Sequence, residues 1–147
     1  IRALFFLARA FIVALKEATG SSARGQEVIA ACPAEFAVLS GDDATAGALA
    51  MMGGAGVISV VSNLVPGPFA RLIGAARAGR QEEARQLVYR YLPLIDLLFI
   101  ESNPIPVKAA LALLGYSANE VRLPLVPLGQ EKLERLRAEL VRLGLLP

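Results

Sequence analysis

The sequence predicts an α/β protein in which a parallel sheet is covered by helices. Up to about residue 80, short apolar runs alternate with helical segments, and each run is followed by a loop of small or polar residues. Parallel neighbouring strands need a crossover connection, which a helix provides. The runs are continuously apolar, which is typical of strands buried on both faces.

The first strand and helix surround a charged motif. Ile12–Leu15 is apolar and partly β-branched, and it predicts a strand that ends at Lys16. Thr19–Ser22 predicts a loop that contains candidates for a helix N-cap. Apolar residues at helical spacing then predict a helix over Gln26–Cys32, which stops before Pro33.

Two further strands follow. Phe36–Leu39 predicts the second strand, and Asp43 in the next loop is a candidate N-cap for a helix of small residues over Ala44–Met52. Gly53-Gly54 ends that helix, and Val57–Val61 predicts the third strand. The order of elements is therefore βαβαβα.

After residue 80 the sequence predicts helices only. Gln81–Ile100 has apolar residues at i, i+3, i+4 and i+7, with Pro93 as a candidate kink. Val107–Leu114 and Gln130–Leu143 predict two more helices. We therefore divide the chain into a sheet-containing part, residues 1–80, and a helical region, residues 81–147.

The chain is unusually apolar for a soluble domain. Its hydrophobic fraction is 55%, and its mean hydropathy is +0.54. Ala44–Ala70 is uncharged and long enough to span a bilayer, but its glycines and prolines favour a helix, a turn and a strand. Ile1–Leu15 resembles the apolar part of a signal peptide, but Arg9 interrupts it. We expect no membrane segment, and instead apolar faces that meet partners absent from these residues.

Composition excludes several kinds of site. The 15 basic and 13 acidic residues give a net charge of +2, and the bases are scattered, so we expect no nucleic-acid partner. One cysteine, Cys32, and no histidine exclude an internal disulfide, a Cys/His zinc site and a Ser-His couple. We expect neither a metal nor a cofactor, so any catalysis uses Lys, Asp, Glu, Ser, Thr or Tyr.

Lys16 is the strongest candidate for chemistry. An ammonium buried at the end of an apolar strand tends to lose its proton, which a nucleophilic amine requires. Because side chains alternate along a strand, Lys16 and Ala14 should face one side and Leu15 the other. Two simpler interpretations stay open: Lys16 extends to solvent, or the adjacent Glu17 merely neutralises it.

Several segments together resemble one family. Ile12–Gly20, which contains Lys-Glu-Ala-Thr-Gly, resembles the sixth-strand motif of dihydrodipicolinate synthases, also called 4-hydroxy-tetrahydrodipicolinate synthases. Leu39–Asp43 and Gly56–Val60 are similar to the seventh and eighth strands. Asn103–Lys108 and Arg122–Leu125 are similar to the C-terminal helical region. The similarity runs in the family's order from Ile12 to the end of the chain.

This resemblance implies a fold and a reaction. Residues 1–80 would be the C-terminal part of a TIM (β/α)8 barrel, strands six to eight with their helices, and residues 81–147 the C-terminal helical region. Lys16 would form a Schiff base with pyruvate, and the backbone carbonyls of Gly41 and Ile58 would line the pyruvate pocket. The partners would be pyruvate and aspartate semialdehyde, in lysine (diaminopimelate) biosynthesis in the cytoplasm, and the intact family is commonly a homotetramer.

The resemblance also shows what these residues lack. The family's first five strands carry its carboxylate-binding loop, its proton-relaying tyrosine and the arginine for the second substrate. Tyr89, Tyr91 and Tyr116 lie in the helical region and do not take the tyrosine's role. Ile1–Phe11 departs from the family pattern. We expect little or no activity from these residues alone; a non-catalytic fragment or degenerate paralogue, or another pyruvate-dependent aldolase such as N-acetylneuraminate lyase, stays open.

Overall fold

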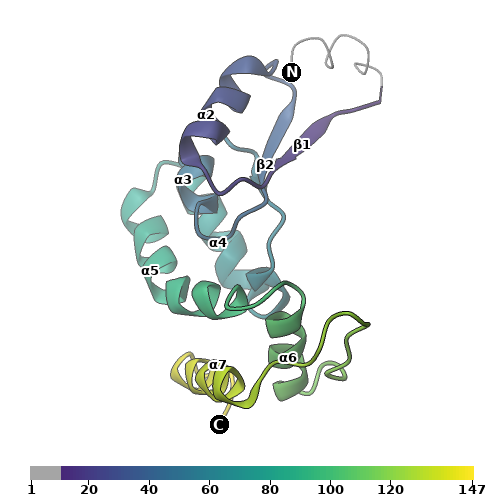
Figure 1. The fold of residues 1–147 in the computed structure, drawn as a ribbon. Helices are drawn as coiled ribbons and strands as arrows, with labels where there is room; N and C mark the ends of the chain where they lie inside the picture. Colours follow the sequence, from purple (N-terminus) through teal and green to yellow (C-terminus); the bar gives the residue numbers. More distant parts are fainter. Residues whose placement is uncertain (1–10) are drawn as a thin grey trace. The chain divides into compact units, whose positions relative to one another are not determined.

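The structure, a computed structural model, describes residues 11–147 and forms two compact units (Figure 1). Unit 1 contains the described residues up to Ser59 together with Pro68–Val88, and unit 2 contains Val60–Gly67 and Tyr89–Pro147. Most of the Ile1–Phe11 segment, whose sequence departs from the family pattern, lies outside the described residues. The predicted boundary at residue 80 stays a prediction.

Unit 1 contains a three-stranded parallel sheet in the order β1-β2-β3, as predicted. The strands are β1 (Ala14–Glu17), β2 (Ala37–Ser40) and β3 (Gly56–Val57). Their register pairs Lys16 with Leu39, and Leu39 with Gly56.

The prediction of a five-residue third strand is wrong. β3 ends at Val57, and a 3-10 helix, η1, covers Val61–Asn63. The β-branched run favours a strand by propensity, but β2 ends at Ser40 and leaves the sheet. The last ladder bond therefore runs from the Ile58 N–H to the Ser40 carbonyl, at 2.8 Å. Because β2 has left the sheet at that point, the run turns into a short helix.

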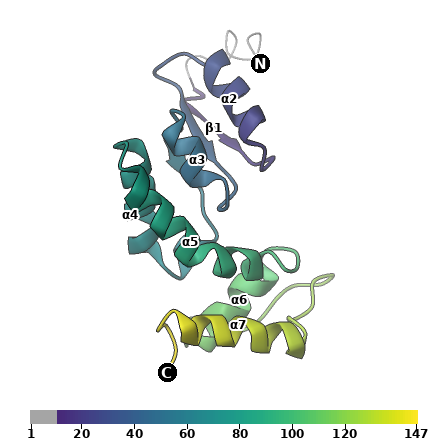
Figure 2. The same ribbon diagram turned by 90° about the vertical axis from the view of Figure 1, so that its left-hand side faces the viewer.

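Helices α2 (Ser22–Ala31) and α3 (Ala46–Met51) lie on one side of the sheet (Figure 2). α2 begins four residues before its predicted start because Ser21 caps it: the Ser21 hydroxyl accepts a hydrogen bond from the Arg24 N–H at 3.2 Å. Ser22–Gly25 has little apolar periodicity, so this first helical turn was not predicted.

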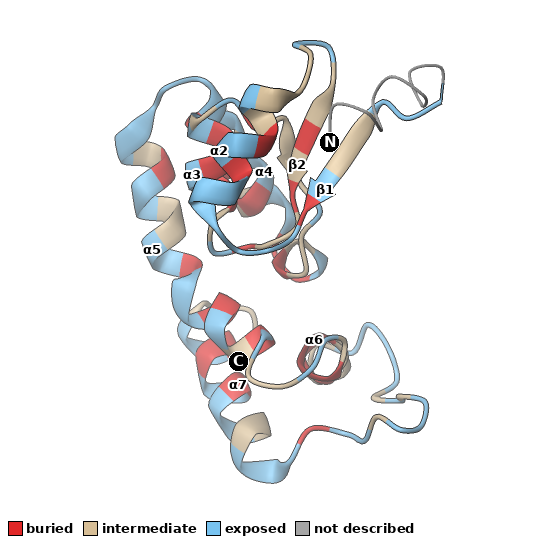
Figure 3. Ribbon diagram, turned by 45° about the horizontal axis from the view of Figure 1, so that its top comes forward, coloured by how far each residue is buried: buried red, intermediate tan, exposed pale blue. Residues whose placement is uncertain are grey.

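Small residues let the helices of unit 1 approach closely. α4 (Pro66–Arg77) packs on α3 where Gly47 meets Leu72. The next helix, α5 (Gln81–Leu98), adds Ala84 to a buried cluster. Figure 3 shows the buried residues along α3 and α4. The members of this cluster are Ala50, Ala75, Ala76 and Ala84, with Ile73 packed against them.

Unit 2 contains the second half of α5 with α6 (Ile105–Leu113) and α7 (Gln130–Arg142). These three helices agree with the predictions to within two residues at each end. Pro93 lies inside α5 without ending it. α6 packs against α7, and the side chains that are fully buried in this unit include Leu94, Leu98, Leu136 and Leu140.

The suspected membrane segment Ala44–Ala70 folds instead as α3, β3, η1 and the start of α4. Within residues 11–147, every helix falls short of the length and apolar character that crossing a bilayer requires. The expectation of a helix, a glycine turn and a short strand is confirmed.

Gly54 gives a test of this packing. A Cβ placed on Gly54 would lie 2.8 Å from the Leu49 carbonyl oxygen, a backbone atom that cannot swing aside. We expect Gly54→Ala to lower the free energy of unfolding by about 1–3 kcal/mol. Urea denaturation followed by far-UV circular dichroism measures it.

Gly74→Ala is the matched control, because Gly74 lies within α4 and a Cβ there meets nothing within 4 Å. We expect it to be neutral or to stabilise by up to about 1 kcal/mol, since alanine is the better helix former. Equal unfolding midpoints for the two variants would contradict the packing described here.

Candidate active site

Lys16 and Glu17 point to opposite faces at the end of β1. Lys16 is exposed, whereas Glu17 is only 7% exposed on the side covered by helices. Figure 3 shows β1 ending in an exposed and then a buried position. The predicted alternation is confirmed. The expectation of a buried lysine is wrong for the described residues, because the helices cover only one face of the sheet.

The carboxylate of Glu17 is directed to the backbone rather than to Lys16. Its Oε1 accepts a hydrogen bond from the Thr19 N–H at 3.0 Å. Among residues 11–147, no ion pair joins Lys16 to Glu17. The interpretation in which Glu17 merely neutralises Lys16 is therefore wrong for the described residues.

Gly41 provides the space in which the Lys16 side chain lies. A Cβ on Gly41 would be 2.7 Å from Lys16 Cε and 3.0 Å from Lys16 Cγ. It would also be 2.6 Å from the methyl group of Ala18. Real Cβ atoms essentially never lie less than 3.0 Å from another heavy atom, so a side chain at position 41 would displace Ala18 or the lysine stem, whereas glycine leaves room for both. We call this space, bounded by Gly41 and Ala18, the lysine slot.

A hydrogen bond closes the lysine slot. The Gly41 N–H donates to the Glu17 carbonyl at 2.6 Å, one residue beyond the last pair of the β1–β2 ladder. Ala18 was not predicted to lie at this contact. Its small size beside Lys16 was the available signal, but the partner, Gly41, is far away in the sequence.

The loop after β2 is a turn held by its own side chains. The buried Ser40 hydroxyl donates to the Asp42 carbonyl at 2.8 Å and accepts from the Asp42 N–H at 3.1 Å. Asp42 Oδ1 accepts from the Thr45 N–H and hydroxyl, both at 2.8 Å. α3 begins after Thr45, so the prediction of Asp43 as its N-cap is wrong. The turn fixes the direction in which Gly41 leaves the sheet.

The three predicted site residues lie at the carboxyl ends of adjacent strands. Lys16 lies one residue before the end of β1, Gly41 follows β2, and Ile58 follows β3. The Lys16 side chain occupies the space that a Cβ on Gly41 would take. Ile58 is 48% exposed and is joined to the residue before Gly41 by its hydrogen bond to Ser40. In α/β proteins, this edge of a parallel sheet is where functional groups gather.

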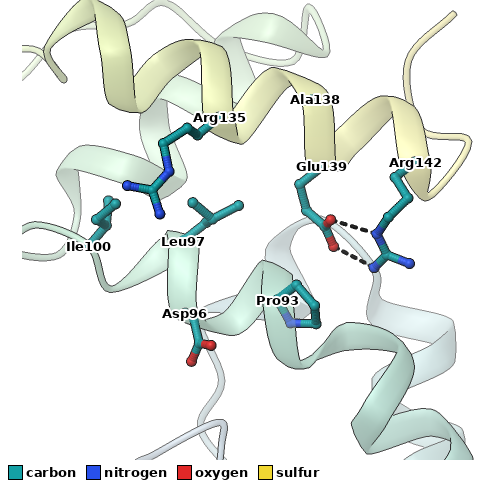
Figure 4. A pocket seen from close by; sticks show the side chains of 8 residues that line it. All are labelled: Pro93, Asp96, Leu97, Ile100, Arg135, Ala138, Glu139 and Arg142. Atoms are coloured by element: carbon teal, nitrogen blue, oxygen red, sulfur yellow. Dashed lines mark hydrogen bonds and ion pairs between the residues drawn. The ribbon is translucent and has the colours of Figure 1, made fainter.

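A separate groove lies in unit 2, between α5 and α7 (Figure 4). Its volume is about 650 Å³, and Leu97 and Ile100 form part of its wall. Glu139 accepts two hydrogen bonds of 2.6 Å from Arg142. These bonds raise the pKa of the Arg142 guanidinium. The residues lining the groove include no lysine, so it does not supply the nucleophile.

The sequence profile of the dihydrodipicolinate synthetase family matches residues 6–143, which include Lys16, Gly41 and Ile58. The chain belongs to this family. The resemblance seen in the separate motifs is therefore confirmed across almost the whole chain.

Relatives in the dihydrodipicolinate synthetase family are similar over most of this chain. The 4-hydroxy-tetrahydrodipicolinate synthase of Chlorobium limicola is 50% identical over 141 residues, which are 95% of this chain and 48% of that protein. The one of Citrifermentans bemidjiense is 49% identical over 127 residues, 86% of this chain and 44% of that protein. The chain thus spans about half the length of these relatives.

Solved structures of the same family share the fold. Dihydrodipicolinate synthase from Aquifex aeolicus superposes with a TM-score of 0.92 at 40% identity, covering 97% of this chain and 49% of that one. The enzyme from Thermotoga maritima gives 0.92 at 39% identity, covering 99% and 50%. A monomeric dihydrodipicolinate synthase variant gives 0.87 at 42% identity, covering 91% and 46%. These likenesses support the α/β class and the parallel sheet.

The contact between Gly41 and Lys16 can be tested without any substrate. We expect Gly41→Ala to push the lysine stem out of the slot, because the added methyl would overlap Cε. Reductive methylation with ¹³C-formaldehyde labels the chain's three lysines, Lys16, Lys108 and Lys132. In NMR spectra, the Lys16 signal should shift while the other two stay in place.

Gly56→Ala is the control on the neighbouring strand. Its Cβ would be 3.2 Å from the end of the flexible Leu39 side chain, which can move aside. We expect the Lys16 signal to stay where it is in this variant. A Lys16 signal that Gly41→Ala leaves unmoved would contradict the slot.

Proposed function

We propose that this chain is the Schiff-base-forming half of a 4-hydroxy-tetrahydrodipicolinate synthase, which condenses pyruvate with aspartate semialdehyde in lysine biosynthesis. The observation that carries the proposal is the placement of Lys16, unpaired with Glu17, against Gly41 at the carboxyl end of the sheet. Identities of 49–50% to synthases that bear this name support the substrate class.

The chemistry follows from the amine. The unprotonated Nζ of Lys16 attacks the ketone carbon of pyruvate, and loss of water gives an imine. The protonated imine withdraws electrons, so the pyruvate methyl group loses a proton and becomes an enamine carbon. That carbon attacks the aldehyde carbon of aspartate semialdehyde, whose oxygen takes up a proton. The amino group of the same substrate then adds to the imine carbon, which closes the ring and expels the Lys16 amine.

The parts of the site have separate roles in this proposal. β1, β2 and β3 are strands six to eight of a (β/α)8 barrel, followed by the helical region from residue 81. The backbone carbonyls of Gly41 and Ile58 face the bound pyruvate. The open face that carries Lys16 is the barrel interior, and it is completed by strands that these residues do not include.

The proposed activity belongs to a protein that also has the first part of the barrel. Removing proton relay and carboxylate positioning should each lower the rate by orders of magnitude. We therefore expect little or no condensation by these 147 residues alone. Assembly as a homotetramer in the cytoplasm is part of the proposal.

Reductive trapping tests the first covalent step. We expect incubation with pyruvate, followed by borohydride reduction and peptide mass spectrometry, to place a pyruvyl adduct on Lys16. Lys108 and Lys132 are internal controls in the same chain, since Lys132 is held 2.7 Å from Glu101 in an ion pair. Lys16→Arg should abolish the adduct, because a guanidinium does not form this imine.

An intact synthase, such as the Thermotoga maritima enzyme, is the positive control. If that enzyme is labelled and Lys16 here is not, these residues do not activate the lysine by themselves, and the non-catalytic fragment becomes the better description of this chain. Equal labelling of all three lysines would show surface reactivity and count against a site.

A further inference from the structure

Glu17 is a buried carboxyl group that the proposed reaction does not use. It is 7% exposed, lies next to Lys16 and belongs to the same strand. Burying a carboxylate destabilises a fold unless hydrogen bonds compensate for the lost water. Its contacts should therefore serve the fold, the site or both.

Glu17 accepts hydrogen bonds from both loops around Lys16, one through its side-chain carboxylate and one through its main-chain carbonyl. The side-chain Oε1 accepts from the Thr19 N–H at 3.0 Å, and the main-chain carbonyl accepts from the Gly41 N–H at 2.6 Å. Thr19 continues the chain of bonds, since its hydroxyl accepts from the Ser21 N–H at 3.2 Å. Ser21 in turn caps α2. One residue thus connects the loop after β1 to the loop after β2.

We infer that Glu17 is a positioning residue for Lys16, an inference that rests on the proposed function. Adjacent residues of a strand project to opposite faces, so an anchor on Glu17 fixes the direction in which Lys16 leaves the backbone. When the anchor is lost, the end of β1 is free to rotate, and the lysine stem leaves the slot beside Gly41.

Three variants of this chain separate positioning from general stability. Glu17→Ala removes the acceptor for Thr19, whereas Glu17→Gln keeps an oxygen at the same place and removes only the charge. Glu139→Ala is the matched control, because Glu139 is also 7% exposed but lies in unit 2, where it binds Arg142. Far-UV circular dichroism and urea denaturation report the stability of each variant.

Two measurements are made on each variant. The first is hydrogen exchange of the Thr19 and Gly41 amides, followed by ¹⁵N NMR, which needs no substrate. The second is the rate of borohydride trapping of pyruvate on Lys16.

We expect Glu17→Ala to speed exchange at Thr19 and Gly41 and to lower the trapping rate by roughly ten- to a hundredfold, as small misplacements of a reacting group do. Glu17→Gln should stay within about threefold of the parent chain, because rescue by an uncharged acceptor is expected of a hydrogen-bonded anchor. Glu139→Ala should change stability alone.

The outcomes distinguish this inference from the proposed function. If the parent chain is trapped at Lys16 and Glu17→Ala is trapped at the same rate, the inference is overturned and the proposed function stands. If Glu17→Gln lowers the trapping rate as much as Glu17→Ala does, the inference of a hydrogen-bonded anchor is overturned as well. If the parent chain is not trapped, the failure belongs to the proposed function, and amide exchange decides: faster exchange in Glu17→Ala alone supports the inference, and unchanged exchange overturns it.

Discussion

The hydrogen bond between the Gly41 N–H and the Glu17 carbonyl is the constraint on which the site depends. It brings the loops after β1 and β2 so close together that no side chain fits at position 41. The lysine stem occupies the space that a Cβ would have taken. Glycine at this position is thus explained by a contact with Lys16, and its backbone conformation needs no unusual φ. The same few atoms pack the two loops together and position the lysine stem, so a substitution at Gly41 would change both.

The two faces of the sheet are covered differently in the described residues. One face is packed with helices whose glycine and alanine residues allow close approach, as in the cluster around Ala50 and Ala75. The other carries Lys16 and is open in the described residues. Much of the chain's high hydrophobic fraction is used in the first face and in unit 2. Exposed apolar side chains, namely Phe11, Ile12 and Val13, lie immediately before β1, which is at the edge of the sheet. An open strand edge of this kind can pair with a further strand.

The sequence predicted local features well and contacts between distant segments poorly. α5, α6 and α7 were predicted closely because their apolar periodicity is strong, and the strand that carries Lys16 was predicted because its apolar run is contiguous. The third strand was overestimated, since strand length depends on a partner and β2 ends at Ser40. The lysine slot was not predicted, because Gly41 gives no sign in the sequence of what it touches. The exposure of Lys16 depends on what covers the open face, which local sequence does not encode.

The alternation of β1 also has a consequence for how this motif tolerates insertion and deletion. Loops on either side of the strand can gain or lose residues while the lysine keeps its face. A single residue inserted between Ala14 and Lys16, with the start of the strand held in register, would exchange the two sides. The ammonium would then lie beneath the helices, and the carboxylate would occupy the mouth of the site. Whether Lys16 occupies an odd or an even position within the four residues of β1 therefore decides whether this edge of the sheet presents a nucleophile or an acid.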